Sequence, residues 1–280
     1  MSTKLAGVIG WPVAHSLSPR LHGFWLREHG IDGAYIPLPT PREDFAQIIN
    51  SLRKLGFAGV NVTVPHKESA FALAHDLDDV AQIAGAVNLL VFKNNRIEGH
   101  NTDAAGLAAS LVEQLGKDTL AGKETILLGA GGAARACVLA LSNLGAQKIS
   151  IVNRNMARAE SLARALEGNV PAQLSPTMFA DWGKVAGDAA LLVNATSAGM
   201  SGAPPLDLSL DPLPKSAAVC DIVYNPLETP LLKQARARGH RVVDGLGMLM
   251  HQAVPAFAAF YGVTPKVTPA LRAELEKALA

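Results

Sequence analysis

The chain has 280 residues, a length that favours two domains, each large enough to bury a core of its own. Its 25 Lys and Arg residues nearly balance its 24 Asp and Glu residues, which excludes a polybasic nucleic-acid binder and an acidic interaction tail. Hydrophobic residues make up 49% of the chain and charged residues 18%, so a disordered protein is excluded as well.

The first hundred residues predict strands and helices in an irregular order. Residues 5–9 are apolar and run into Gly10-Trp11-Pro12, which indicates a buried strand ending in a turn rather than a signal peptide. Ser18-Pro19 predicts a helix start with Ser18 as N-cap, and 40–43 has the pattern of a capping box that begins a helix reaching about residue 55. Asn94-Asn95 predicts a hairpin turn. We expect further strands at 34–37, 59–64, 86–93 and 96–100, and further helices at 67–75, 78–84 and 103–115.

From residue 124 the pattern changes to a regular alternation of strands and helices. Such alternation is typical of a parallel, doubly wound sheet. The expected strands are 124–128, 148–152, 190–194, 218–222 and 241–243, the helices between them are 133–144, 156–166 and 230–238, and two final helices are 248–260 and 269–279. No apolar run reaches the ~18 residues that span a bilayer, and we expect no membrane partner. Two cysteines without metal-ligand spacing, Cys137 and Cys220, favour reduced thiols, no metal site and a cytoplasmic location.

A glycine-rich segment directly follows the expected strand 124–128. It reads Gly129, Ala130, Gly131, Gly132, Ala133, Ala134 and fits G-x-G-x-x-A at the start of a helix. Small residues at these points permit a tight turn, close approach of a pyrophosphate and packing of the helix on the strand, while the helix N-terminus attracts the phosphates. This context predicts dinucleotide binding; the alternative is a turn that merely permits close packing.

The residues after the next strand indicate which dinucleotide is bound. An NAD site usually has Asp or Glu there to bind the ribose 2′-OH. This chain has Asn153 and Arg154, with Arg158 one helical turn later. Guanidinium groups attract a 2′-phosphate that a carboxylate repels, so the sequence predicts NADP. The alternative is a solvated basic helix start, although positive charge there opposes the helix dipole.

Polar residues in the first hundred residues suggest a reaction centre. Asn61 and Thr63 share one face of the expected strand 59–64, with Val60, Val62 and Val64 on the other, and Lys67 begins the next helix. A lysine at the end of such a strand is a candidate general acid/base, although a single lysine is more often a solvated surface residue.

Three further clusters support this hypothesis. Ser16 and Ser18 place two hydroxyl groups at a helix start, where they either cap the helix or hold a carboxylate. Asn88 lies inside an apolar strand, where an unpaired amide is costly. Asn101-Thr102-Asp103 opens a helix, and Asp103 either caps it or sets the protonation of a lysine.

These motifs, in their order and over almost the whole chain, resemble those of the shikimate/quinate dehydrogenase family, above all the NADP-dependent shikimate dehydrogenases. The matching segments are Ser16-Leu17-Ser18-Pro19, 61–67, 85–88, Asn101-Thr102-Asp103, 129–133, Asn153-Arg154, 194–197 and 244–248. The resemblance implies an oxidoreductase acting on a CH–OH group, which reversibly reduces 3-dehydroshikimate to shikimate in the pathway to chorismate and the aromatic amino acids. Two positions depart from the family pattern: Asn155 stands where Thr is frequent, and His100 replaces an acidic residue.

The resemblance also implies roles for individual residues. Lys67 matches the proton donor and acceptor, and Asp103 matches its partner. The substrate-binding positions are matched by Ser16, Ser18, Asn61, Thr63, Asn88, Tyr224 and Gln252. The cofactor-binding positions are matched by Asp79, Gly129, Ala130, Gly131, Gly132, Ala133, Asn153, Arg154, Arg158, Ile222 and Gly245.

Chemistry and resemblance together predict an α/β architecture with a discontinuous chain path. Residues 1–102 and 246–280 would form a discontinuous α/β substrate-binding domain, and residues 103–245 a Rossmann-type NADP-binding domain. We expect a small-molecule substrate, no nucleic acid, and a monomer or homodimer. One alternative is a quinate/shikimate dehydrogenase that uses NAD and NADP alike. Another is an inert binding or sensor protein on the same scaffold.

Overall fold

The computed structural model describes residues 3–279, which form two compact units. The first unit comprises residues up to Thr102 together with Gln252–Ala278, and the second comprises Asp103–His251. The chain therefore passes between the units after Thr102 and again within one helix, α9 (Gly245–Tyr261). None of the helices in residues 3–279 combines the length and the apolar character that a membrane crossing requires.

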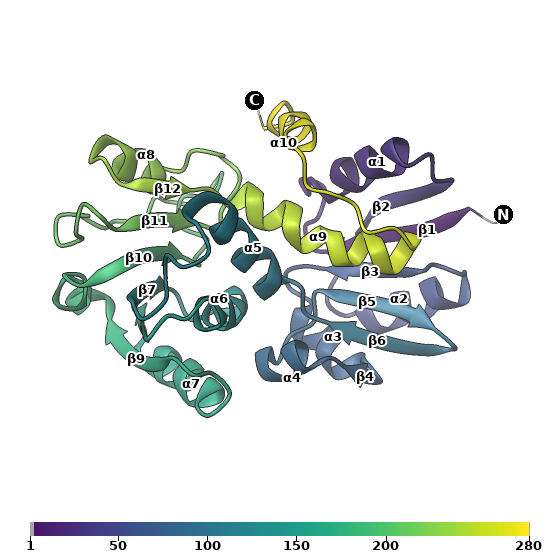
Figure 1. Ribbon diagram of the computed structural model, residues 1–280. Helices are drawn as coiled ribbons and strands as arrows, with labels where there is room; N and C mark the ends of the chain where they lie inside the picture. The colour runs from purple at the N-terminus through teal and green to yellow at the C-terminus, as the bar shows by residue number, and fades with distance from the viewer. Residues whose placement is uncertain (1–2, 280) are drawn as a thin grey trace. The chain divides into compact units, whose positions relative to one another are not determined.

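The first unit is built on a mixed six-stranded sheet in the order β2-β1-β3-β5-β6-β4 (Figure 1). Strand β1 pairs in parallel with β2 and β3, whereas β3, β5 and β6 form antiparallel pairs. The strands are β1 (Lys4–Gly10), β2 (Gly33–Pro39), β3 (Gly59–Val62), β4 (Asp76–Leu77), β5 (Leu89–Lys93) and β6 (Arg96–His100). The helices are α1 (Ser18–Glu28), α2 (Phe45–Lys54), α3 (Lys67–Leu73), α4 (Asp79–Ala84), the end of α9 and α10 (Pro269–Glu276).

Strand alternation places Asn61 on the opposite face of this sheet from Val60 and Val62. Val60 and Val62 belong to a buried cluster with Phe45 and Ile49 of α2. Asn61, between the two valines, points to the opposite face because successive side chains of a strand alternate. The sequence correctly predicted this period-two pattern within β3, and it places a polar side chain where α1 and the end of α9 pack.

The second unit is built on a parallel sheet in the order β12-β11-β10-β7-β8-β9 (Figure 1). The order reverses between β7 and β10, as in a Rossmann-type doubly wound fold, which confirms the predicted fold class. Its strands are β7 (Glu124–Leu128), β8 (Lys148–Asn153), β9 (Gln173–Met178), β10 (Ala189–Asn194), β11 (Ala218–Asp221) and β12 (Arg241–Val243). Its helices are α5 (Asp103–Leu115), α6 (Gly132–Asn143), α7 (Met156–Leu166), α8 (Pro230–Ala237), the start of α9, and a 3₁₀ helix, η1 (Phe179–Val185).

Several predicted boundaries are wrong because tertiary contacts use the residues differently. Strand β3 ends at Val62, so Val64 does not continue its apolar face and is 69% exposed. Helix α2 begins at Phe45, because the Thr40 hydroxyl donates to the carbonyl of Leu38 at 3.2 Å and does not cap a helix. Strands β4 and β9 were not predicted. The Asn94-Asn95 hairpin is confirmed, with both residues at positive φ.

Candidate functional site

A buried hydrogen-bond network in the first unit is centred on Asn88. The side chain of Asn88 accepts from the Thr102 N–H at 2.8 Å and donates to the Thr102 hydroxyl at 2.9 Å. Gln252 Oε1 accepts from the Asn88 amide at 3.5 Å and from the Thr102 hydroxyl at 3.4 Å. Asn88 is 3% exposed and Thr102 6% exposed, so this polar cluster stands in the protein interior with its groups paired.

Asn61 joins the same cluster from β3. Its amide donates to the main-chain oxygen of Asn88 at 3.3 Å, and its side-chain oxygen accepts from the Tyr35 hydroxyl at 2.8 Å. Burial raises the pKa of Tyr35 well above its usual value, the neighbouring Tyr261 adds to this rise, and a hydrogen bond with Ser18 lowers it. Tyr35 thus remains a donor at neutral pH and holds one orientation of the Asn61 amide.

His22 supports Tyr35 from α1. The two rings stack with centroids 3.8 Å apart and planes 6° apart. Within residues 3–279 both ring nitrogens of His22 lack a hydrogen-bond partner, and burial lowers the pKa of His22 to about 3. A neutral, fully buried imidazole therefore lies against the polar cluster.

The two candidate serines lie at the start of α1. Ser18 is the first helical residue, so the prediction that it serves as N-cap is wrong; Leu17 holds the cap position without a side-chain cap. The Ser16 hydroxyl instead accepts the Ser18 N–H at 3.2 Å. Ser18 is 6% exposed and bonded to Tyr35, which brings it together with Asn61 through one tyrosine.

Lys67 and Thr63 follow β3. Lys67 is the first residue of α3, its side chain is half-buried, and its carbonyl accepts the Val87 N–H at 3.0 Å, adjacent to Asn88. Thr63 lies beyond the strand and donates its N–H to the carbonyl of Ile9 at 2.9 Å. Lys67 belongs to the first unit and Asp103, which opens α5, to the second, so their pairing stays a prediction.

The imidazole of His100 lies beside two carboxylates, those of Asp78 and Glu98. His100 Nδ1 lies 3.2 Å from Asp78 Oδ2, and Nε2 lies 3.9 Å from Glu98 Oε2. The hydrogen bond to Asp78 raises the pKa of His100, against the opposing effect of burial. Asp78 also caps α4 at the Ala81 N–H, and Asp79 follows on the first turn of that helix, where it is exposed.

The phosphate loop of the second unit lies at the carboxyl end of β7, next to the reversal of strand order. Gly129 has a φ of +106°, and a Cβ there would come within 2.9 Å of Thr196 Cγ2. At Gly131 and Gly132 a Cβ would meet no described protein atom within 4 Å, so the chain itself does not require glycine there. No side chain caps α6 at Gly131. Open space beside the two glycines and a helix start without a side-chain cap are both features that a phosphate-binding loop requires.

A hollow of about 300 Å³ adjoins this loop. Asn153 and Arg154 line it at the end of β8, and the Arg154 guanidinium lies 5.5 Å from the centre of the Phe179 ring. Among the described residues its lining contains no carboxylate. The complete lining is Leu128, Gly129, Val152, Asn153, Arg154, Phe179, Thr196, Ser197, Ala198, Ala203, Pro204, Pro205 and Leu206.

The remaining predicted cofactor and substrate residues do not line this hollow. Arg158 is exposed on the first turn of α7, where its N–H donates to Asn155, the N-cap residue of that helix. Ile222 and Tyr224 follow β11 and are half-buried. Gly245 begins α9 against them, since a Cβ there would come within 2.3 Å of the Ile222 carbonyl oxygen.

Sequence reasoning missed part of both sites. Tyr35 holds Asn61 in the first unit, and Phe179 and Thr196 line the hollow; Thr102, which bonds Asn88, was predicted only as part of a helix start. The sequence could have predicted Thr196 as a site residue, because it follows the apolar strand β10 and lies in a motif shared with the family. Tyr35 and Phe179 had none, because an aromatic residue in an apolar segment is ordinarily part of the core.

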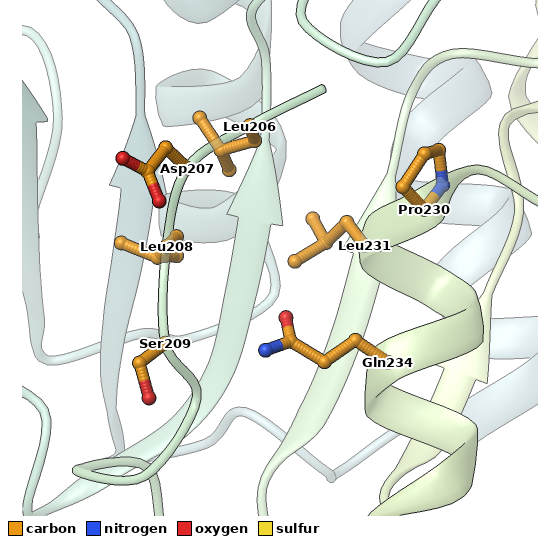
Figure 2. A pocket seen from close by; sticks show the side chains of 7 residues that line it. All are labelled: Leu206, Asp207, Leu208, Ser209, Pro230, Leu231 and Gln234. Atoms are coloured by element: carbon orange, nitrogen blue, oxygen red, sulfur yellow. The ribbon is translucent and has the colours of Figure 1, made fainter.

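A second hollow, of about 400 Å³, lies between the extended segment 206–209 and α8. Figure 2 shows Pro230, Leu231 and Gln234 projecting from α8 toward that segment. It contains none of the predicted site residues, and within residues 3–279 no three His, Cys, Asp or Glu side chains group to hold a metal ion.

Comparison with known proteins places these features in one family. Residues 8–90 match the model of the shikimate dehydrogenase substrate binding domain, and residues 110–201 match that of shikimate / quinate 5-dehydrogenase. The shikimate dehydrogenase (NADP(+)) of Acidiphilium cryptum is 54% identical over 96% of this chain and 94% of that protein.

Two solved structures have the same fold. The shikimate 5-dehydrogenase of Thermus thermophilus in complex with NADP(H) and shikimate is 36% identical, with a TM-score of 0.85 and coverage of 99% and 98% of the two chains. The quinate dehydrogenase of Corynebacterium glutamicum in complex with NAD is 31% identical, with a TM-score of 0.88 and coverage of 98% of both chains. From its sequence, its fold and its two sets of site residues, the chain belongs to the shikimate dehydrogenase family.

Proposed function

We propose that this chain is an NADP-dependent shikimate dehydrogenase, which reversibly reduces 3-dehydroshikimate to shikimate on the route to the aromatic amino acids. The single observation that carries the cofactor assignment is the hollow beside the phosphate loop, lined by Asn153 and Arg154 and, among its described residues, by no carboxylate. Identity of 54% to an NADP-dependent shikimate dehydrogenase supports the substrate.

The residues of the second unit fit NADP. The backbone from Gly129 to Ala133 and the uncapped start of α6 would hold the pyrophosphate. Arg154 and Arg158, on the two sides of the α7 N-cap, would bind the 2′-phosphate, and Asn153 the adjoining ribose. Bound NADP supplies the hydride acceptor or donor. We assign Ile222, Gly245 and Asp79 to the same cofactor by family resemblance.

The buried polar cluster of the first unit would orient the substrate. Ser16 and Ser18 at the start of α1 would bind its carboxylate, and we assign Tyr224 to help them. Ring hydroxyls would meet the amides of Asn61, Asn88 and Gln252, together with Thr63. The mutual bonds of these groups fix their donors and acceptors before the substrate arrives, which reduces the ordering that binding requires.

Lys67 would carry the proton. Reduction of the ketone places negative charge on the C3 oxygen, and the Lys67 ammonium stabilises that oxygen and donates its proton to it. In the oxidative direction the neutral amine takes the hydroxyl proton back. The Asp103 carboxylate would favour the charged form of Lys67 and keep its amine oriented.

The functional domains of this proposal are residues 1–102 with 246–280 for the substrate and 103–245 for NADP. Cys137 and Cys220 are both buried thiols, which supports a reducing, cytoplasmic compartment. We propose a monomer or homodimer, and light scattering after size exclusion would distinguish the two.

The decisive experiment compares shikimate and quinate with NADP⁺ and NAD⁺ in all four pairings by the change in absorbance at 340 nm. We expect the highest kcat/KM for shikimate with NADP⁺. Equal rates with NAD⁺, or a preference for quinate, would support the alternative of a quinate/shikimate dehydrogenase. Tight binding of shikimate and NADP⁺ without any absorbance change would support an inert binding protein.

A further inference from the structure

Asp221, the last residue of β11, is a fully buried carboxylate with three hydrogen-bond donors. Its Oδ1 accepts from the Asn194 amide at 3.0 Å and from the Val223 N–H at 3.1 Å. Its Oδ2 accepts from the Thr229 hydroxyl at 2.7 Å. Burial raises the pKa of Asp221, and these three bonds act in the opposite direction. A carboxylate in this place is costly to bury, so the donors around it are tightly held.

The bond to Asn194 leads directly to the candidate cofactor hollow. Asn194 Oδ1 accepts both the N–H of Thr196, at 3.1 Å, and its hydroxyl, at 2.7 Å. The Thr196 hydroxyl in turn accepts the Ala198 N–H at 3.1 Å, and the Asn194 amide donates to the Ala198 carbonyl at 3.3 Å. The segment from Thr196 to Ala198 lines the hollow. By accepting from the Asn194 amide, Asp221 fixes the side chain that bonds both Thr196 and Ala198.

The same loop also meets the phosphate loop. A Cβ on Gly129 would lie 2.9 Å from Thr196 Cγ2 and 3.2 Å from the Ala195 carbonyl oxygen. Because the 194–198 loop and the phosphate loop approach each other closely, their separation sets the width of the hollow beside Gly129. A displacement of Thr196 would therefore alter the space beside Gly129 without changing any charged group in the hollow.

The third donor, Thr229, connects Asp221 to helix α8. Thr229 is the N-cap of α8, and its hydroxyl accepts the Leu232 N–H at 3.3 Å. Thr229 does not line the hollow beside Arg154. The hydrogen bonds of Asp221 thus follow two routes: one through Asn194 to the loop at the hollow, and one through Thr229 to the N-cap of α8, which packs beside Gly199 just after that loop.

We propose that Asp221 is a positioning residue for cofactor binding, which acts through Asn194 to hold the 194–198 loop against the phosphate loop. The proposal rests on the proposed binding of NADP by this hollow. It assigns Asp221 no contact with the cofactor and no proton transfer.

The test measures the Kd of NADP⁺ by isothermal titration calorimetry, with thermal melting of each variant in parallel. Asp221→Ala removes every acceptor, and we expect the Kd to rise about tenfold or more, a loss of ~1.4 kcal/mol. Asp221→Asn keeps an oxygen for Asn194 and Val223 while its amide faces Thr229, so the Kd should stay within about threefold of wild type. Thr229→Val is the matched control: it should lower Tm through the lost cap and leave the Kd within the same limit.

A second variant covers the case in which Asp221→Ala does not fold. Asn194→Ser keeps an oxygen near the Thr196 N–H but lacks the amide that Asp221 holds, and we expect the same rise in Kd. Unchanged affinity in a folded Asp221→Ala or Asn194→Ser variant overturns the proposal, as does an equal rise in Thr229→Val. A wild-type chain that fails to bind NADP⁺ removes the proposed function and this proposal with it, whereas wild-type binding with unchanged variants removes this proposal alone.

Discussion

The two candidate sites use different parts of the chain. The candidate site of the first unit consists of buried side chains that bind one another, with Asn88 at the centre and Tyr35 and Asn61 beside it. The candidate site of the second unit consists of the backbone around Gly129 and of two exposed cations, Arg154 and Arg158. A network of side chains recognises a ligand through the types of residue that form it. A backbone loop recognises a phosphate through its conformation. Substitutions should therefore separate substrate chemistry from cofactor binding.

The largest effect is expected for Lys67→Ala. Loss of positioned proton transfer should lower kcat by about 10²- to 10⁴-fold, measured at 340 nm with saturating shikimate and NADP⁺. The Kd of NADP⁺ should not change, because Lys67 belongs to the first unit. Lys93→Ala, an exposed lysine at the end of β5, is the control. Turnover near the wild-type rate would remove Lys67 from the mechanism.

Arg154→Gln tests the second unit alone. A charge-assisted hydrogen bond contributes about 1.5–3 kcal/mol, so kcat/KM with NADP⁺ should fall by roughly 10- to 100-fold while the value with NAD⁺ is retained. Arg164→Gln, at the other end of α7, should change neither value. An equal loss with both cofactors would show that Arg154 acts on the pyrophosphate or the fold rather than on the 2′-phosphate.

His22→Leu tests how the buried site of the first unit responds to acid. His22 has a pKa of about 3 when folded against 6.5 as its ordinary value, so the unfolded chain binds the extra proton first. Stability from this group is complete above pH 6.5 and falls by up to about 1.4 kcal/mol per pH unit as the pH drops toward 3. Urea unfolding from about pH 7 to about pH 4.5 should show a smaller pH slope in the variant. His29→Asn, a partly exposed histidine, should keep the wild-type slope.

The smallest effect is expected for His100→Gln. The folded pKa of His100 is raised by Asp78, so its contribution is present below pH 6.5 and is lost as the pH rises through the folded value. His100 is about one-third exposed, which limits the pair to about 0.2–1 kcal/mol. The stability difference between wild type and variant should be larger at about pH 5.5 than at about pH 8.5. The reverse order would mean that Asp78 does not stabilise the charged imidazole.

Local sequence rules predicted the second unit well because its elements follow local patterns. The alternation of apolar strands and helices indicated the parallel sheet, and the glycine segment after β7 located the phosphate loop. Strand β9 was missed because Gln173, Ser175 and Pro176 interrupt its apolar character. In the first unit, the end of β3 and the start of α2 were misplaced: β3 ends at Val62, and Thr40 bonds to Leu38 while Asp44 holds the N-cap position of α2.

The sequence by itself determined the fold class, the position of the glycine-rich loop and the residue types of the polar candidate site, because these depend on periodicity and on short motifs. The tertiary structure decided which polar groups are paired. Asn88 with Thr102 and Gln252, Tyr35 with Asn61, and Asp221 with Asn194 join residues far apart in the chain. Such pairs form because buried polar groups require partners, and only the folded chain determines which partners are within reach.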